Sequence, residues 1–181
     1  MSLDFAAESA QRFAPLARRF CAWVELRAKM PVGDADLHDL HAIVAELQAA
    51  AARIPNAGSW GGKDDAVEEA AEAAAPDDVE LRRARDLAAA LAEQLPVREY
   101  IKLLDPFGGA GSENVVGFTI DDDLGDIYHD LREGIALYEL GKPGDAVWQW
   151  WFSYWTHWGR HATGLQTALW SHLAEGGGYT A

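Results

Sequence analysis

Apolar residues recur at three- and four-residue intervals along most of the chain, which is the spacing of one face of an α-helix. The pattern predicts helices over about residues 4–29, 34–53, 77–95, 119–140 and 143–174. No alternating apolar and polar run of strand length recurs, so the pattern predicts no sheet. We therefore expect an all-α fold, a single-domain helical bundle of four to five helices with a long C-terminal helical hairpin.

Local signals refine the ends of these helices. Pro15 lies inside the first one, and its missing N–H predicts a kink or a new helix start there. Asp34 and Asp36 are candidate N-caps of the second helix, and Thr119 is the candidate N-cap of the fourth. The turn over residues 141–144 is short, so the last two helices should be antiparallel neighbours.

Two stretches lack helical periodicity. Residues 55–76 are rich in alanine, glycine and acid, so we interpret them as a flexible linker within the one domain of residues 1–181, with Trp60 as its candidate anchor. Residues 97–119 are irregular, and residues 115–118 suit a short extended segment. The residues expected to be buried in this part are Tyr100, Ile101, Leu103 and Leu104.

Composition excludes several classes of protein. The 181 residues include 15 basic and 29 acidic side chains, a formal net charge of −14, which argues against binding nucleic acid or anionic membrane surfaces. The sequence contains no run of 18 apolar residues, so it predicts no membrane span. The single cysteine, Cys21, leaves no intrachain disulfide, and the N-terminus does not resemble a secretory signal. We expect a cytoplasmic protein.

Six of the eight tryptophans lie between Trp148 and Trp170. At 100° per residue, apolar and aromatic side chains cover more than half of this helix, so we expect a central helix packed on two sides. Core packing is one interpretation of these rings. The other is an aromatic surface or pocket for a partner, since tryptophan is enriched at binding hot spots. Its candidate residues are Trp148, Trp151, Trp155 and Trp158.

A cluster of carboxylates and imidazoles is expected across the C-terminal hairpin. His157 and His161 are four residues apart and lie on one helical face, as two metal ligands would. In an antiparallel hairpin, residues at one height have a constant sum of residue numbers. That rule places Asp126 beside His157, Asp123 beside His161, and Asp130 beside Tyr154. We call the following residues the Asp–His cluster: Asp123, Asp126, Asp130, His157 and His161.

Three interpretations of the Asp–His cluster stay open at this point. The residues can form structural hydrogen bonds between the helices, hold zinc, iron or manganese, or perform general acid–base chemistry. Two specific metal motifs are missing. The segment from His157 to His161 lacks the glutamate of the zinc proteases, and no Glu-x-x-His of the di-iron bundles occurs.

Several short motifs occur together in this chain. They are Phe20-Cys21-Ala22-Trp23-Val24-Glu25, Asp105-Pro106, Asp122-Asp123-Leu124-x-Asp126-Ile127-Tyr128, Ala146-Val147-Trp148 and His157-Trp158-Gly159-x-His161-Ala162. Together they resemble an uncharacterised bacterial family, domain of unknown function 5063. The resemblance implies a bacterial, soluble, helical protein without an assigned activity, and it leaves the three interpretations open.

From these patterns we expect a non-enzymatic protein-interaction or structural module, which binds a protein partner or a second copy of itself through the aromatic helix. The alternative is a metal-binding protein or a metal-dependent hydrolase that holds a divalent ion in the Asp–His cluster. Imidazole nitrogens within about 4 Å of two carboxylates around an open pocket favour a metal site, whereas a closed, dry hydrogen-bonded pair favours a structural role.

Overall fold

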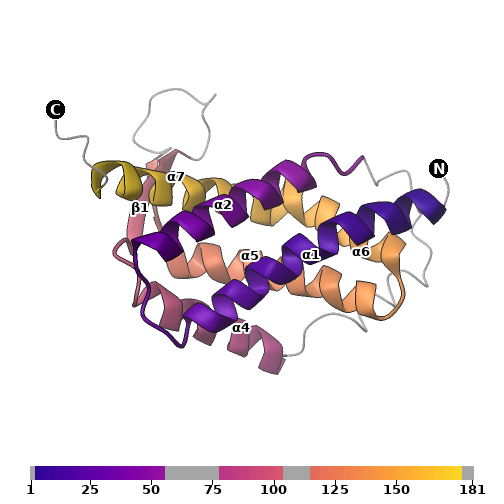
Figure 1. The fold of residues 1–181 in the computed structure, drawn as a ribbon, viewed down its shortest axis with the longest axis horizontal. Helices are drawn as coiled ribbons and strands as arrows, with labels where there is room; N and C mark the ends of the chain where they lie inside the picture. Colours follow the sequence, from indigo (N-terminus) through magenta and orange to yellow (C-terminus); the bar gives the residue numbers. More distant parts are fainter. Residues whose placement is uncertain (1–2, 56–77, 104–114, 177–181) are drawn as a thin grey trace.

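The computed structural model describes residues 3–55, 78–103 and 115–176, and it is a helical assembly with one small hairpin (Figure 1). Its elements are α1 (Leu3–Arg27), α2 (Asp34–Ala51), α4 (Asp78–Ala92), β1 (Glu99–Leu103), β2 (Val115–Thr119), α5 (Ile120–Glu139), α6 (Pro143–Ser153), η3 (Tyr154–Trp158) and α7 (Gly159–Gly176). The all-α class is confirmed. The expected linker, with Trp60, lies outside the described residues apart from its first residue, and the single-domain organisation stays a prediction.

Helix α5 is the centre of the assembly. It packs against α1, α4, α6 and α7, so side chains on several of its sides are buried. Burying each large aliphatic side chain contributes about 1.5–3 kcal/mol, and this helix buries many of them. The stripe expected from the sequence is buried at Leu124, Ile127, Leu131 and Ile135, and Tyr138 is partly buried.

The N-terminal helices differ from the expectations at two points. Helix α1 runs through Pro15, so no new helix starts there, and the kink expected as the alternative stays a prediction. Pro15 is exposed, while Phe13 and Phe20 on the buried face hold the helix in the core. The N-cap of α2 is Gly33 rather than Asp34 or Asp36. Its amide donates a 2.9 Å hydrogen bond to the Asp36 carboxylate, which therefore caps the helix from inside its first turn.

The prediction of no sheet was wrong. Strands β1 and β2 form an antiparallel pair in which Glu99 faces Thr119 and Leu103 faces Val115. Both strands are short and largely solvent-exposed, so they carry no alternating pattern that sequence analysis could detect. Ile101, expected to be buried, is 76% exposed. The Leu103 side chain and Leu104 lie outside the described residues.

The expected last helix is interrupted by a turn of π-helix. Segments α6, η3 and α7 follow one another directly, and η3 is wound more loosely than an α-helix. The 100° rotation assumed from the sequence therefore fails between Tyr154 and Trp158. Among the described residues, no helix combines the length and apolar character needed to cross a membrane.

Candidate metal site

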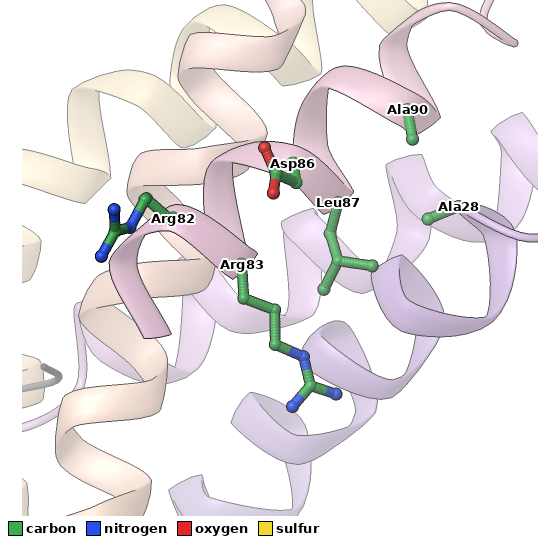
Figure 2. A pocket seen from close by; sticks show the side chains of 6 residues that line it. All are labelled: Ala28, Arg82, Arg83, Asp86, Leu87 and Ala90. Carbon is green, nitrogen blue, oxygen red and sulfur yellow. The ribbon is translucent and has the colours of Figure 1, made fainter. Parts of the chain in front are cut away.

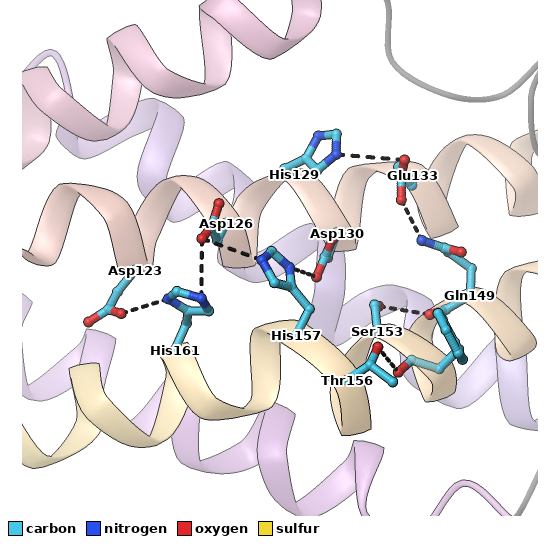
Figure 3. Close-up of polar contacts among 11 residues, drawn as sticks. Asp123, Asp126, His129, Asp130, Glu133, Gln149, Ser153, Thr156, His157 and His161 are labelled. Carbon is cyan, nitrogen blue, oxygen red and sulfur yellow. Dashed lines mark hydrogen bonds and ion pairs between the residues drawn. The ribbon is translucent and has the colours of Figure 1, made fainter. Parts of the chain in front are cut away.

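The aspartates of the Asp–His cluster lie on one side of α5. They begin in its first turn, where carboxylates interact favourably with the partial positive charge of a helix N-terminus. Asp123, Asp126 and Asp130 follow one another at three- and four-residue spacing, which places them along one side of the helix. All three face the imidazoles of His157 and His161, which η3 and α7 supply (Figure 3).

Each imidazole lies between two carboxylates (Figure 3). His157 Nδ1 is 2.8 Å from Asp130 Oδ2, and His157 Nε2 is 3.5 Å from Asp126 Oδ2. His161 Nδ1 is 2.9 Å from Asp123 Oδ1, and His161 Nε2 is 3.2 Å from the same Asp126 oxygen. The two Nε2 atoms therefore converge on one oxygen of Asp126, while separate carboxylates hold the two Nδ1 atoms.

The contacts across the hairpin agree largely with the sequence-based expectation. Asp126 with His157 and Asp123 with His161 are in contact, as the antiparallel geometry indicates. Asp130, which was placed beside Tyr154, is hydrogen bonded to His157 instead. The π-helical turn starts at Tyr154 and changes the direction of the side chains that follow it. The expectation assumed a regular α-helix and could not include this change.

Exposure to solvent changes sharply within the Asp–His cluster. Asp123 is completely buried, and Asp130 and His161 are nearly so. The side chains of Asp126 and His157 are 34% and 36% exposed. Two of the three side chains that converge are thus partly exposed, whereas the carboxylates that hold the Nδ1 atoms are buried.

His161 Nε2 has no hydrogen-bond partner, although it is buried. Asp126 Oδ2 lies 3.2 Å from this atom, within ion-pair distance, but the two groups are not aligned for a hydrogen bond. A buried nitrogen without a partner is costly, and native structures rarely retain one without a reason. The lone pair or the proton of His161 Nε2 is therefore available where the two Nε2 atoms approach Asp126.

Burial disfavours the ionised form of two carboxylates at and beside the cluster. Burial raises the pKa of Asp130, although the hydrogen bond and the charge of His157 lower it in part. Burial, and then the charge of Asp126, raise the pKa of Asp122. A bound cation would stabilise the ionised form of these groups.

A second group of ligand-type side chains lies farther along α5. It consists of His129, Asp130 and Glu133, with His129 Nε2 3.6 Å from Glu133 Oε1. Glu133 also accepts a hydrogen bond from Gln149 on α6, and burial raises its pKa (Figure 3). Because Glu133 already accepts a hydrogen bond from Gln149, this group is a weaker candidate for a metal site than the Asp–His cluster.

The aromatic residues do not share one surface. Trp158 is fully buried, and its ring centroid is 6.5 Å from that of Phe13 and 4.9 Å from that of Tyr154. Trp155 is 62% exposed, and Trp148 and Trp151 are half-buried. The Trp148 ring stacks on Phe152 at 4.9 Å. The four expected residues are thus divided between core and solvent.

A groove lies away from the Asp–His cluster, between the end of α1 and helix α4 (Figure 2). Its volume is about 500 Å³, and its lining residues are Ala28, Arg82, Arg83, Asp86, Leu87 and Ala90. None of them belongs to the candidate residues expected from the sequence. Apart from one carboxylate and two guanidinium groups the lining is aliphatic, so the groove presents no set of metal ligands.

Sequence reasoning missed one residue that contacts the cluster. The Tyr100 hydroxyl, on β1, donates a 2.5 Å hydrogen bond to Asp123 Oδ2. Tyr100 was expected only to be buried, and no sequence signal placed it near α5, because the hairpin that carries it was not predicted.

Comparison with known proteins agrees with the fold. A family model described as a domain of unknown function, DUF5063, matches residues 5–175. The chain is also similar to the crystal structure of protein BF1032 from Bacteroides fragilis, with 21% identity and a TM-score of 0.61. The similarity covers 93% of this chain and 91% of that chain, and at this identity it shows a shared fold. None of the curated proteins matches.

Proposed function

The chain belongs to the DUF5063 family, as its motifs indicated, and we propose that it binds a divalent metal ion through Asp126, His157 and His161. One observation carries this proposal. One ligand atom from each of the three residues lies within 4.8 Å of the others, and the residues come from separate helical segments. That spacing suits three ligands around one ion.

The surrounding carboxylates favour a metal site over a purely structural pair. Histidines that ligate a metal usually donate the other ring N–H to a carboxylate, which fixes the tautomer and directs the free nitrogen to the ion. Asp130 and Asp123 occupy this position for His157 and His161. The buried His161 Nε2 forms no hydrogen bond and lies 3.2 Å from Asp126 Oδ2, which is where a second ligand to the same ion would place it.

The chemistry of the ligands indicates the class of ion. Two imidazoles and one carboxylate suit zinc, iron(II) or manganese better than calcium or magnesium, which prefer oxygen ligands. Three protein ligands leave at least one coordination position for water, and the exposed side of Asp126 and His157 provides access to it. Hydrolysis by such a water stays a prediction.

The interaction function expected from the sequence stays a prediction as well. The exposed rings of Phe152 and Trp155 are the observation that supports it. They belong to α6 and η3, so a protein partner on this surface would lie close in sequence to His157.

The test is metal binding by chelator-treated, untagged protein. We expect one equivalent of Zn²⁺ or Co²⁺ per chain, measured by mass spectrometry after dialysis and by titration. His157→Ala should abolish binding while leaving the helical circular dichroism unchanged, since the side chain is partly exposed. His38→Ala, an exposed histidine on α2, is the matched control and should bind as the wild type does. Unchanged binding by His157→Ala, or no binding by the wild type, rejects the site.

A further inference from the structure

A hydrogen-bonded chain leads from the β-hairpin to the proposed metal position. The Tyr100 hydroxyl donates to Asp123 Oδ2 at 2.5 Å, and Asp123 Oδ1 accepts from His161 Nδ1 at 2.9 Å. Each oxygen of this completely buried carboxylate thus has its own partner. The chain ends at His161 Nε2, which forms no hydrogen bond and lies 3.2 Å from Asp126 Oδ2.

The fold makes room for this chain at one glycine. A Cβ atom on Gly164 of α7 would lie 1.9 Å from the Tyr100 hydroxyl oxygen and 2.9 Å from its Cζ. Any side chain larger than hydrogen would therefore displace the phenol from Asp123. On the same strand, Lys102 Nζ donates a 2.9 Å hydrogen bond to the carbonyl of Arg160, which holds β1 against the start of α7.

Building on the metal site proposed above, we propose that Tyr100 is a positioning residue for that site and acts through Asp123. Asp123 must accept from His161 Nδ1 if Nε2 is to present its lone pair to a metal. A carboxylate with one bonded oxygen can still rotate about its side-chain torsions, whereas two directional hydrogen bonds fix it. Tyr100 supplies the second bond, since no solvent reaches Asp123.

This assignment connects the hairpin to the metal. If docking of Tyr100 improves metal affinity, then bound metal must favour the docked hairpin by the same factor. The β-hairpin, whose outer residues are exposed, is then more than a connection between α4 and α5. It completes the support of one ligand from outside the helical assembly.

The experiment compares Co²⁺ and Zn²⁺ affinities of the full chain carrying Tyr100→Phe with those of wild type. Second-shell partners of metal ligands typically change affinity by about 10- to 100-fold, and we expect a loss near the lower end of that range. Tyr128→Phe is the matched control, because Tyr128 also donates to a carboxylate, Glu25, at 2.6 Å but does not contact the cluster. It should keep the wild-type affinity within about twofold, well below the tenfold change of a lost second-shell partner.

Two further variants separate positioning from general loss of structure. Gly164→Ala should weaken metal binding as Tyr100→Phe does, since it displaces the phenol. In an Asp123→Asn background, Tyr100→Phe should cause little further loss, because its effect passes through Asp123. If the wild type binds metal and Tyr100→Phe binds it with the same affinity, this inference alone is overturned. The same holds if the losses of affinity caused by Tyr100→Phe and Asp123→Asn add up in the double variant. A wild type that binds no metal overturns the proposed function and this inference with it.

Discussion

Gly134 of α5 lies at a close contact between α5 and α6. The Trp150 indole of α6 is fully buried over it and donates from Nε1 to the Leu131 carbonyl at 3.2 Å. The Phe13 ring packs against the same indole at 4.9 Å. A Cβ atom on Gly134 would lie 2.0 Å from Trp150 Nε1, so the absence of a side chain allows α5 and α6 to approach.

Gly134→Ala should lower the free energy of unfolding by about 1–3 kcal/mol or more, the cost of overpacking a rigid core. The indole cannot move aside without losing its hydrogen bond and its contact with Phe13. Urea denaturation followed by tryptophan fluorescence measures the effect. Gly144→Ala is the control, because nothing lies within 4 Å of its Cβ position and alanine favours helix by about 1 kcal/mol. Equal urea midpoints for both variants would contradict this packing.

At the scale of the element, the π-turn η3 decides the direction of several functional side chains. The Gly159 amide donates to the Tyr154 carbonyl five residues earlier, which is the π-helical pattern. The turn lies between the α6 core, with its buried Trp150, and the α7 segment with His161. His157 lies within the turn, so its contacts with Asp126 and Asp130 depend on this local winding.

Gly159→Ala should disturb η3, because the new Cβ would lie 2.3 Å from the Tyr154 carbonyl oxygen. We expect a loss of about 1–3 kcal/mol in unfolding free energy together with weaker metal binding, since His157 moves with the turn. Gly125→Ala on α5 is the control, with an ordinary 3.6 Å contact to Ala88 Cβ. Calorimetry and metal titration measure both effects. If Gly159→Ala binds metal with the same affinity as Gly125→Ala, the winding of the π-turn does not affect the metal site.

At the scale of the whole molecule, the proposed metal joins α5 to the segments η3 and α7. These segments lie on opposite sides of the C-terminal hairpin, and the side-chain contacts of the Asp–His cluster connect them. A metal that binds the folded state alone stabilises it, by about 2.7 kcal/mol at a free concentration one hundred times the Kd. The hairpin is also the centre of the core, so the gain extends to global unfolding.

Zn²⁺ in excess should therefore raise the midpoint of thermal unfolding of the wild type, and a chelator should reverse the increase. Differential scanning fluorimetry on the intrinsic tryptophans measures it. His157→Ala should show no metal-dependent shift, while His38→Ala should show the full shift. A similar increase in both variants would indicate binding elsewhere on this acidic chain and would count against the Asp–His cluster.

The sequence by itself determined most of the helices, the buried face of α5 and the pairing of the C-terminal hairpin. These features depend on local periodicity and on a short turn, and both are determined by residues that are close together in the sequence. For the same reason, simple addition of residue numbers placed Asp126 beside His157 and Asp123 beside His161. The family also followed from motifs that occur in order along the chain.

Only the tertiary structure decided how the remaining groups meet. The β-hairpin is held by backbone pairing between short exposed strands, which leaves no hydrophobic pattern, so Tyr100 could not be placed beside Asp123. The π-turn is a change of backbone winding that no residue pattern around Tyr154 predicts. The division of the tryptophans between core and surface was likewise visible only in the folded structure. The convergence of two imidazole nitrogens on one carboxylate oxygen depends on both packing and winding, because each side chain direction is fixed by neighbours distant in the chain.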